Sequence, residues 1–298
     1  MSKSGHKLIT ARWFAGDLTD YRSVYPVRLL SVHHHAINLV VNGWPHLLAL
    51  SSPALYKGPA AICLEEEDFY ICTGQINCLS KGWFRPGSIN LSGKEHRLTI
   101  DWANCPAYCF APPPLPVFNP LTINQSLNLL RSWLSRAGDV SSSAALLGAE
   151  GGENYFRTEI MNNFPPLVEA VFTGSQQEFA VTCRRLSGLG RGATPTGDDL
   201  IHGALIACRY YFHSCRIPWI PPHYPPQLGS STTLLGAHML DIAHRGLTIE
   251  PVRSLLSGIF TGHLTPGCLR LLLEVGSSTG YDLAAAIFYT LSRLLAVC

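Results

Sequence analysis

The chain has 298 residues, enough to bury a full core as one large domain or two modest ones, and we expect two. Hydrophobic residues make up 47% of it and charged residues only 14%. An average chain has about 25% charged residues, so this surface is poor in charge, as in a subunit that is covered within a complex. The net charge is +2 and the 22 Lys and Arg residues form no basic run, which argues against nucleic acid as the main partner.

The N-terminal residues are polar, and no apolar run long enough for a membrane span occurs. The longest apolar stretch, from Leu283 to Val297, is interrupted by Ser292 and Arg293. We therefore expect a cytoplasmic protein with no membrane partner. The ten cysteines include no Cys-x-x-Cys pair, and we expect buried reduced thiols rather than disulfides or a zinc site.

Alternating or short apolar runs from Ser23 to Phe110 predict a β-rich half. Asn42-Gly43 is a strong hairpin signal between two of these runs. We expect a small antiparallel sheet, a sandwich or a barrel. The predicted strands are Ala36–Val41, Pro45–Leu50, Ala60–Leu64, Asp68–Cys72, Ser88–Leu91 and His96–Trp102.

Two polar clusters interrupt this half. In a strand the middle ring of His33-His34-His35 would point away from its neighbours, so at most two of the rings could share a metal ion. No carboxylate lies at a spacing that would complete such a site. Glu65-Glu66-Glu67-Asp68 is predicted to be a solvated turn.

The proline-rich stretch 111–116 predicts an extended connector, and we place the domain boundary there. The predicted fold class is α+β, with a β-rich domain over residues 1–116 and a mostly helical domain over residues 117–298. Asn119-Pro120, Ser175, Ser230 to Thr233 and Thr265-Pro266 are the predicted helix starts.

The stretch from Gly188 to Asp199 combines four glycines with an arginine, threonines and carboxylates. Free backbone N–H groups and a helix N-terminus would attract a small anion such as phosphate or a carboxylate. Thr196 and Asp199 have the spacing of a capping box. Alternatively, the glycines only end one helix and Thr196 only begins the next. A predicted helix precedes the loop and the lysine of a phosphate-binding P-loop is absent, so neither a dinucleotide nor a P-loop nucleotide is expected.

Asp199 and His202 lie three residues apart on one helix face, which fits either a metal or proton-relay pair or a helix cap beside a structural histidine. The sequence Thr279-Gly280-Tyr281-Asp282 repeats the Thr196 corner 83 residues later. Two such helix starts could enclose one anion, or both could serve only as caps.

Three segments together resemble the AllH family, a subunit of oxamate carbamoyltransferase, and His35–Leu39 is similar to its N-terminal strand. Where that family usually has Leu and His, this chain has Ala193 and Ser277. The segments are Gly190–Asp199, Thr232-Thr233 and Gly276–Asp282.

The resemblance implies a subunit that, with FdrA-like and AllG-like partners, converts oxalurate and phosphate into oxamate and carbamoyl phosphate in purine or allantoin breakdown. The Ser-Thr-Arg-Thr signature of other carbamoyltransferases is missing, so any shared activity would use an unrelated site.

We expect a small anionic substrate, such as phosphate, carbamoyl phosphate or an oxamate-like ligand, and no cofactor; a divalent cation such as Mg²⁺ has no support in the residue pattern. Asp199, Asp282 and His202 are the candidate catalytic residues. The alternatives are a non-catalytic assembly subunit and, more weakly, a metal-dependent hydrolase built on Asp198, Asp199, His202 and Asp282. The candidate substrate-binding residues are Gly190, Arg191, Gly192, Thr194, Thr196, Gly197, Asp198, Thr232, Thr233, Ser278, Thr279 and Gly280.

Overall fold

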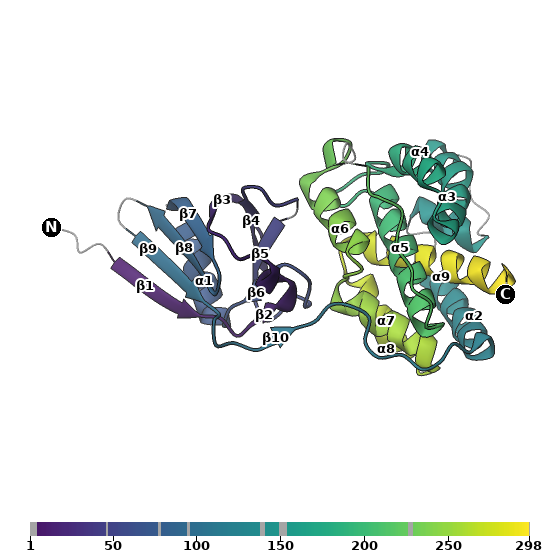
Figure 1. The fold of residues 1–298 in the computed structure, drawn as a ribbon, viewed down its shortest axis with the longest axis horizontal. Helices are drawn as coiled ribbons and strands as arrows, with labels where there is room; N and C mark the ends of the chain where they lie inside the picture. The colour runs from purple at the N-terminus through teal and green to yellow at the C-terminus, as the bar shows by residue number, and fades with distance from the viewer. Residues whose placement is uncertain are drawn as a thin grey trace. The chain divides into compact units, whose positions relative to one another are not determined.

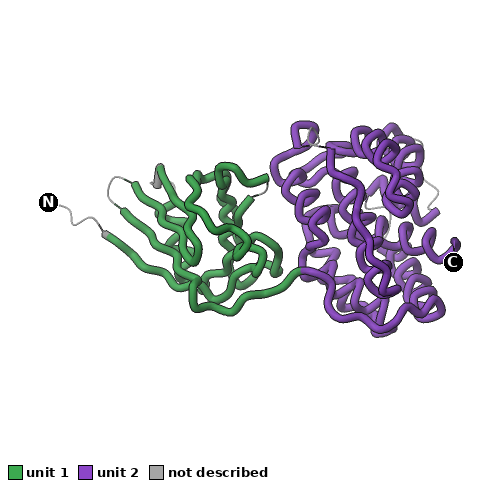
Figure 2. Tube along the Cα trace, in the orientation of Figure 1, with its two compact units in different colours: residues 1–110 green, residues 111–298 purple. Residues whose placement is uncertain are grey.

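The computed structural model describes residues 5–45, 47–76, 79–93, 96–137, 141–148, 154–225 and 229–297. The chain divides into two compact units, residues 1–110 and 111–298 (Figure 2). The division lies at the start of the proline-rich stretch 111–116.

In the N-terminal unit the described strands form one curled sheet in the order β1-β9-β8-β7-β3-β4-β5-β6-β2-β10 (Figure 1). Most neighbours are antiparallel, but β1–β9, β5–β6 and β2–β10 are parallel, so the sheet is mixed rather than the antiparallel one expected. The strands are β1 (Gly5–Thr10), β2 (Trp13–Ala15), β3 (Tyr25–Val32), β4 (Ala36–Val41), β5 (Leu47–Ser51), β6 (Ala61–Cys63), β7 (Leu79–Arg85), β8 (Ser88–Gly93), β9 (His96–Asp101) and β10 (Ala107–Tyr108), with a short 3-10 helix η1 (Gly16–Asp20) after β2.

The hairpin predicted at Asn42-Gly43 is confirmed. Strands β4 and β5 pair in antiparallel fashion on either side of it, and Gly43 has a φ of 83°, a conformation that favours glycine. Side chains of β4 alternate between buried and half-buried positions, so one face of this hairpin packs into the core of the unit.

The strand predicted over Asp68–Cys72 is wrong, and so is the turn predicted just before it. Both lie in α1 (Glu66–Ile76) or beside its start. The acidic side chains of the first turn favour a helix N-terminus, and Phe69, Cys72 and Ile76 recur at helical spacing and are buried. A window of five residues was too short to distinguish this period from that of a strand.

The strand assumed for the three histidines is wrong, because they lie in the turn between β3 and β4 and do not alternate as strand residues do. His34 Nδ1 and His35 Nε2 are 2.8 Å apart, and His35 Nδ1 lies 2.9 Å from Ser52 Oγ. The structure therefore brings His34 and His35 together, while His33 hydrogen-bonds to Ser31.

The second unit is helical, so the α+β class is confirmed. Its Asn119-Pro120 start is confirmed as well, because Asn119 Oδ1 accepts hydrogen bonds from the backbone N–H groups of Leu121 and Thr122. The helices are α2 (Pro120–Ala137), η2 (Ser142–Leu147, a 3-10 helix), α3 (Tyr155–Thr173), α4 (Gln176–Leu186), α5 (Thr196–Ser214), α6 (Leu234–His244), α7 (Glu250–Thr261), α8 (Pro266–Leu273) and α9 (Thr279–Val297).

Helices α5 and α9 form the centre of this unit and cross each other there (Figure 1). Nearly every residue of α5 from Gly197 to Tyr211 is buried. A Cβ at Gly203 would lie 2.6 Å from the Cβ of Ala286, so the small residues allow the two helices to touch. Each of these two positions lies seven residues beyond the first residue of its helix, Thr196 and Thr279, so the two N-termini lie at the same end of the crossing.

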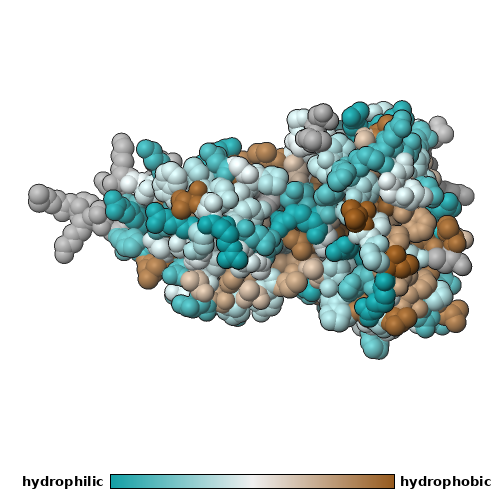
Figure 3. Space-filling view, viewed as in Figure 1, coloured by the Kyte–Doolittle hydropathy of each residue, from teal (hydrophilic) through white to brown (hydrophobic). Residues whose placement is uncertain are grey.

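On the face in view, hydrophobic side chains lie scattered among hydrophilic ones in both units (Figure 3). Large exposed hydrophobic side chains in the helical unit include Leu121, Ile217 and Ile220. Within the described ranges, no helix combines the length and the apolar character that crossing a bilayer requires.

Candidate functional site

The two glycine-rich corners predicted to be copies of each other meet in the structure. Thr194 Oγ1 and Thr279 Oγ1 are 2.6 Å apart, and Thr196 Oγ1 donates a hydrogen bond of 3.0 Å to Asp282 Oδ2. Each corner joins a shorter helix to a long central one, α4 to α5 and α8 to α9. The first turns of α5 and α9 are thus hydrogen-bonded side by side.

The capping box predicted at Thr196 and Asp199 is wrong. Thr196 is the first residue of α5, and the residue before it, Pro195, has no side chain that can cap. The hydroxyl of Thr196 bonds instead to Asp282, 86 residues away, and the carboxylate of Asp199 accepts no backbone N–H. The tertiary partner displaces the local capping contact that the spacing predicted.

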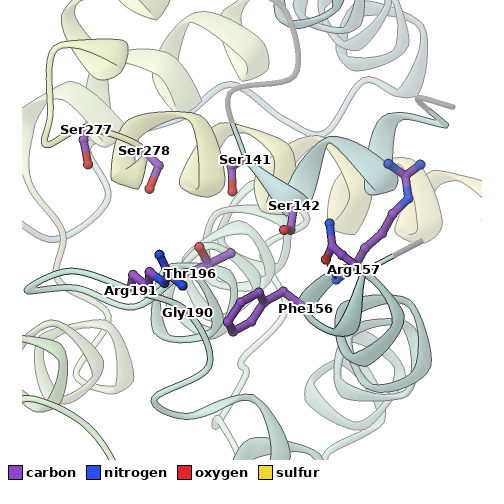
Figure 4. A pocket seen from close by; sticks show the side chains of 10 residues that line it. Ser141, Ser142, Phe156, Arg157, Gly190, Arg191, Thr196, Ser277 and Ser278 are labelled. Atoms are coloured by element: carbon purple, nitrogen blue, oxygen red, sulfur yellow. Dashed lines mark hydrogen bonds between the residues drawn. The ribbon is translucent and has the colours of Figure 1, made fainter. Parts of the chain in front are cut away.

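A cavity of about 540 Å³ opens beside these helix starts (Figure 4). Of the predicted residues, Gly190, Arg191, Thr196 and Ser278 line it, as does Ser277. Figure 4 shows Ser277, Ser278 and Ser141 in a row opposite Arg191 and Thr196. The full lining is Ser141, Ser142, Asn154, Phe156, Arg157, Gly190, Arg191, Thr196, Ser277 and Ser278.

Among the described residues that line the cavity, two carry a positive charge and none is acidic. Arg191 lies at one end of the view in Figure 4 and Arg157 at the other. The helices α3, α5 and α9 all begin at or beside the cavity wall, and Asn154, the cap of α3, accepts a 2.8 Å hydrogen bond from the N–H of Arg157. Two guanidinium groups and three helix N-termini make this cavity attractive to an anion.

Two buried carboxylates at the helix starts, Asp282 and Asp198, are held by hydrogen bonds. Asp282 accepts hydrogen bonds from Ser143 Oγ at 2.5 Å and from Thr196 Oγ1 at 3.0 Å. Asp198 accepts from the N–H of Gly188 at 3.0 Å and from the hydroxyl of Thr232. Burial raises the pKa of both carboxyl groups, and these hydrogen bonds offset part of the rise.

Asp199 differs from both. Its side chain is fully buried, and neither carboxylate oxygen has a hydrogen-bond partner of good geometry. Burial, and then the nearby carboxyl groups of Asp282 and Asp198, raise the pKa of Asp199 well above its usual value. The hydroxyls of Thr279 and Thr194 counteract only part of this rise. Asp199 is therefore the group in this cluster that favours the neutral form most strongly.

His202 lies one turn further along α5 and is not among the residues that line the cavity. Its Nδ1 lies 3.1 Å from the carbonyl oxygen of Met239 and its Nε2 lies 2.8 Å from Thr248 Oγ1. Complete burial lowers the pKa of His202 to about 4, so the ring is neutral near pH 7. In this arrangement both ring nitrogens already have partners away from Asp199.

Other predicted residues stabilise the first corner through contacts outside the cavity lining. Thr232 binds Asp198, and the Thr233 hydroxyl both donates to the carbonyl of Ala193 and accepts from the N–H of Gly236 at the start of α6. Gly190 and Gly192 have φ values of 118° and 108°, which L-residues rarely adopt. These contacts fix the path of the loop that carries Arg191.

Five lining residues were not predicted from the sequence: Ser141, Ser142, Asn154, Phe156 and Arg157. Asn154 followed by an apolar segment carries a helix-start signal that could have been read. Nothing local links the serines or Arg157 to the glycine-rich corners, because the contacts join positions far apart in the chain.

Nowhere in the described ranges do three or more His, Cys, Asp or Glu side chains converge as a metal site requires. The grouping of Asp198, Asp199, His202 and Asp282 that would build a metal-dependent hydrolase is therefore not a ligand set in this geometry.

Residues 186–291, which run from the end of α4 into α9 and carry both corners, match the family model described as oxamate carbamoyltransferase subunit AllH. This part of the helical unit is similar to the AllH family. No curated protein matches the chain, and no solved structure does. The AllH match covers Gly190, Arg191, Thr196, Ser277 and Ser278 of the cavity wall. It does not cover the remaining lining residues, Ser141, Ser142, Asn154, Phe156 and Arg157.

Proposed function

We propose that this protein is a subunit of an oxamate carbamoyltransferase-like complex and binds a small anionic substrate in the cavity between the two corners. The observation that carries this proposal is the lining itself. Arg191, Arg157 and three helix N-termini border one space of about 540 Å³, and none of the described residues that line it is acidic. Pockets of about 300–1,000 Å³ are typical of small-molecule sites.

Each group has a role in this proposal. Arg191 and the adjacent loop amides neutralise the charge of a phosphate or carboxylate, and Thr196 with the serines orients the uncharged part of the substrate. Asp282 lies behind Thr196 of the wall, and Asp282 and Asp199 position the carbamoyl nitrogen. The reaction breaks the carbamoyl C–N bond of oxalurate and forms a C–O bond to phosphate, which gives oxamate and carbamoyl phosphate.

The partners in this proposal are FdrA-like and AllG-like subunits, and the complex works in the cytoplasm in purine or allantoin breakdown. The low proportion of charged residues, 14%, and exposed side chains such as Ile217 and Ile220 fit a subunit that is covered by others. The same features fit a second candidate, an assembly subunit that binds partners but no substrate.

Two measurements test the proposal and separate these candidates. Titration calorimetry of the full chain with phosphate, carbamoyl phosphate and oxamate should give heat with at least one of them. In the complex reconstituted with both partners, formation of carbamoyl phosphate from oxalurate and phosphate should fall about a hundredfold in Arg191→Ala, as for other preorganised anion donors.

Arg270→Ala is the matched control, because Arg270 lies exposed on α8 and does not line the cavity. Its activity should equal that of the unchanged complex. Full activity in Arg191→Ala would overturn the proposed site, and stable partner binding without heat from any of the three anions would favour the assembly role.

A further inference from the structure

The hydroxyl groups around Asp282 have a fixed polarity. A carboxylate has no proton to give, so each hydroxyl that hydrogen-bonds to it must be the donor. Ser143 and Thr196 donate to its two oxygens, and the hydroxyls of Ser141 and Ser278 lie near enough to lower the pKa of Asp282. A carboxylate accepts about four such bonds, so one buried side chain can organise all four hydroxyls.

This polarity decides what the cavity offers to a ligand. A serine or threonine hydroxyl has one proton, and once that proton points at Asp282 only oxygen lone pairs remain for other partners. Three of the four hydroxyl residues, Ser141, Thr196 and Ser278, line the cavity. Along this edge the wall therefore accepts hydrogen bonds.

The rest of the wall has the opposite character. Arg191 and Arg157 can only donate hydrogen bonds, and backbone N–H groups at helix starts do the same. The cavity thus has a donor side for an anionic group and an acceptor edge on Asp282. A ligand that carried only acceptor atoms would form no hydrogen bond with the acceptor edge and would bind more weakly than one that carries a donor there.

We propose that Asp282 is a specificity-determining positioning residue: it turns the cavity hydroxyls into an acceptor edge that selects ligands with an amide –NH₂ group beside their anionic group. This inference rests on the proposed function, because it assumes that the same cavity binds an anion. It goes further in assigning the discrimination to four hydroxyls and the carboxylate that orients them.

Matched ligand pairs test it directly. Oxamate and pyruvate have the same charge and nearly the same shape and differ in an NH₂ group against a CH₃ group, as do carbamoyl phosphate and acetyl phosphate. Calorimetry on the full chain should give a dissociation constant about tenfold lower for the amide member of at least one pair, the effect of one or two well-placed hydrogen bonds.

Three variants test which residues cause this difference between the two dissociation constants of a pair. In Asp282→Asn the side-chain NH₂ can donate to a hydroxyl and reverse its polarity, and in Thr196→Val one acceptor is removed. In both variants the ratio of the two dissociation constants within a ligand pair should fall toward one. The affinity for pyruvate or acetyl phosphate should stay within about threefold. Thr196→Ser keeps the hydroxyl and should keep the ratio. Thr290→Val is the control, because Thr290 lies buried on the same helix α9 with no hydrogen-bond partner and does not line the cavity.

The outcomes separate the two proposals. No heat with any of the four ligands in the unchanged chain would overturn the proposed function. Binding with equal affinity within each pair would overturn only the acceptor edge, as would a ratio that survives in Thr196→Val. If Asp282→Asn does not fold, the Thr196→Val and Thr196→Ser pair decides the question.

Discussion

The two corners of the helical unit have nearly the same sequence but hold their carboxylates differently. Thr196, Gly197 and Asp199 in the first correspond to Thr279, Gly280 and Asp282 in the second. In both, the helix start packs against the last turn of the helix before it: a Cβ on either glycine would lie 1.8 Å from a carbonyl oxygen, that of Leu186 or that of Leu272. The backbone architecture of the corner is thus duplicated.

The surroundings are not duplicated. Asp282 packs beside η2, which supplies Ser143, while neither oxygen of Asp199 has a hydrogen-bond partner of good geometry. One copy of the motif therefore holds a carboxylate that orients hydroxyls, and the other holds a carboxyl group that favours its neutral form. The repeated motif determines how the helices pack. The element that packs beside each copy, η2 in the case of Asp282, determines how its carboxyl group is held.

The largest expected effect concerns the shared architecture. Gly197→Ala and Gly280→Ala should each lower the free energy of unfolding by about 3 kcal/mol or more, because the added methyl group meets backbone oxygen that can move only with a helix. Urea denaturation followed by circular dichroism measures this. Equal losses in both variants would support equivalent corners.

Gly267→Ala is the control for these variants. Gly267 lies in the first turn of α8, and the nearest atom to an added Cβ is Thr265 Oγ1 at 3.5 Å. This variant should be neutral or slightly more stable, since alanine is the better helix former. A loss below 1 kcal/mol in either corner glycine would contradict the close packing described above.

The next effect distinguishes the two carboxyl groups. The raised pKa of Asp199 means that the folded protein holds its proton to a higher pH than the unfolded chain, so this group lowers the free energy of unfolding as the pH rises from about 4 through the folded pKa. Asp199→Asn removes that penalty. The variant should be more stable than the unchanged chain by about 1–3 kcal/mol at pH 8, with the gain shrinking toward pH 4.

Asp282→Asn is the comparison, measured by urea denaturation at the same pH values. It should gain less than Asp199→Asn or lose stability, because its hydroxyl donors lose a charged acceptor. A gain for Asp199→Asn that does not depend on pH would show that Asp199 is not neutral in the folded state.

The smallest effect concerns the bond that joins the corners. Thr194→Val and Thr279→Val keep side-chain shape and remove one hydroxyl each from the 2.6 Å contact. A double-mutant cycle in urea should give a coupling energy of about 1 kcal/mol. Strictly additive losses would mean that the hydroxyls do not stabilise the corner as a pair.

Local patterns were sufficient for much of the fold. The hairpin at Asn42-Gly43 and the helix start at Asn119-Pro120 were predicted because turn and cap chemistry depends on adjacent residues. The segment Asp68–Cys72 was assigned to a strand because a short apolar run carries no clear period.

The candidate site, like the fold, could be predicted only in part from the sequence. The sequence by itself determined that two Thr-Gly-x-Asp helix starts exist, that Arg191 accompanies the first, and that the segment resembles the AllH family. Only the tertiary structure decided that the helix starts touch, that Ser141, Ser143 and Arg157 join them, and that Thr196 bonds to Asp282 rather than capping its own helix. Capping and turn signals act over a few residues, whereas these contacts join positions 86 to 139 residues apart, and no local pattern in the chain encodes them.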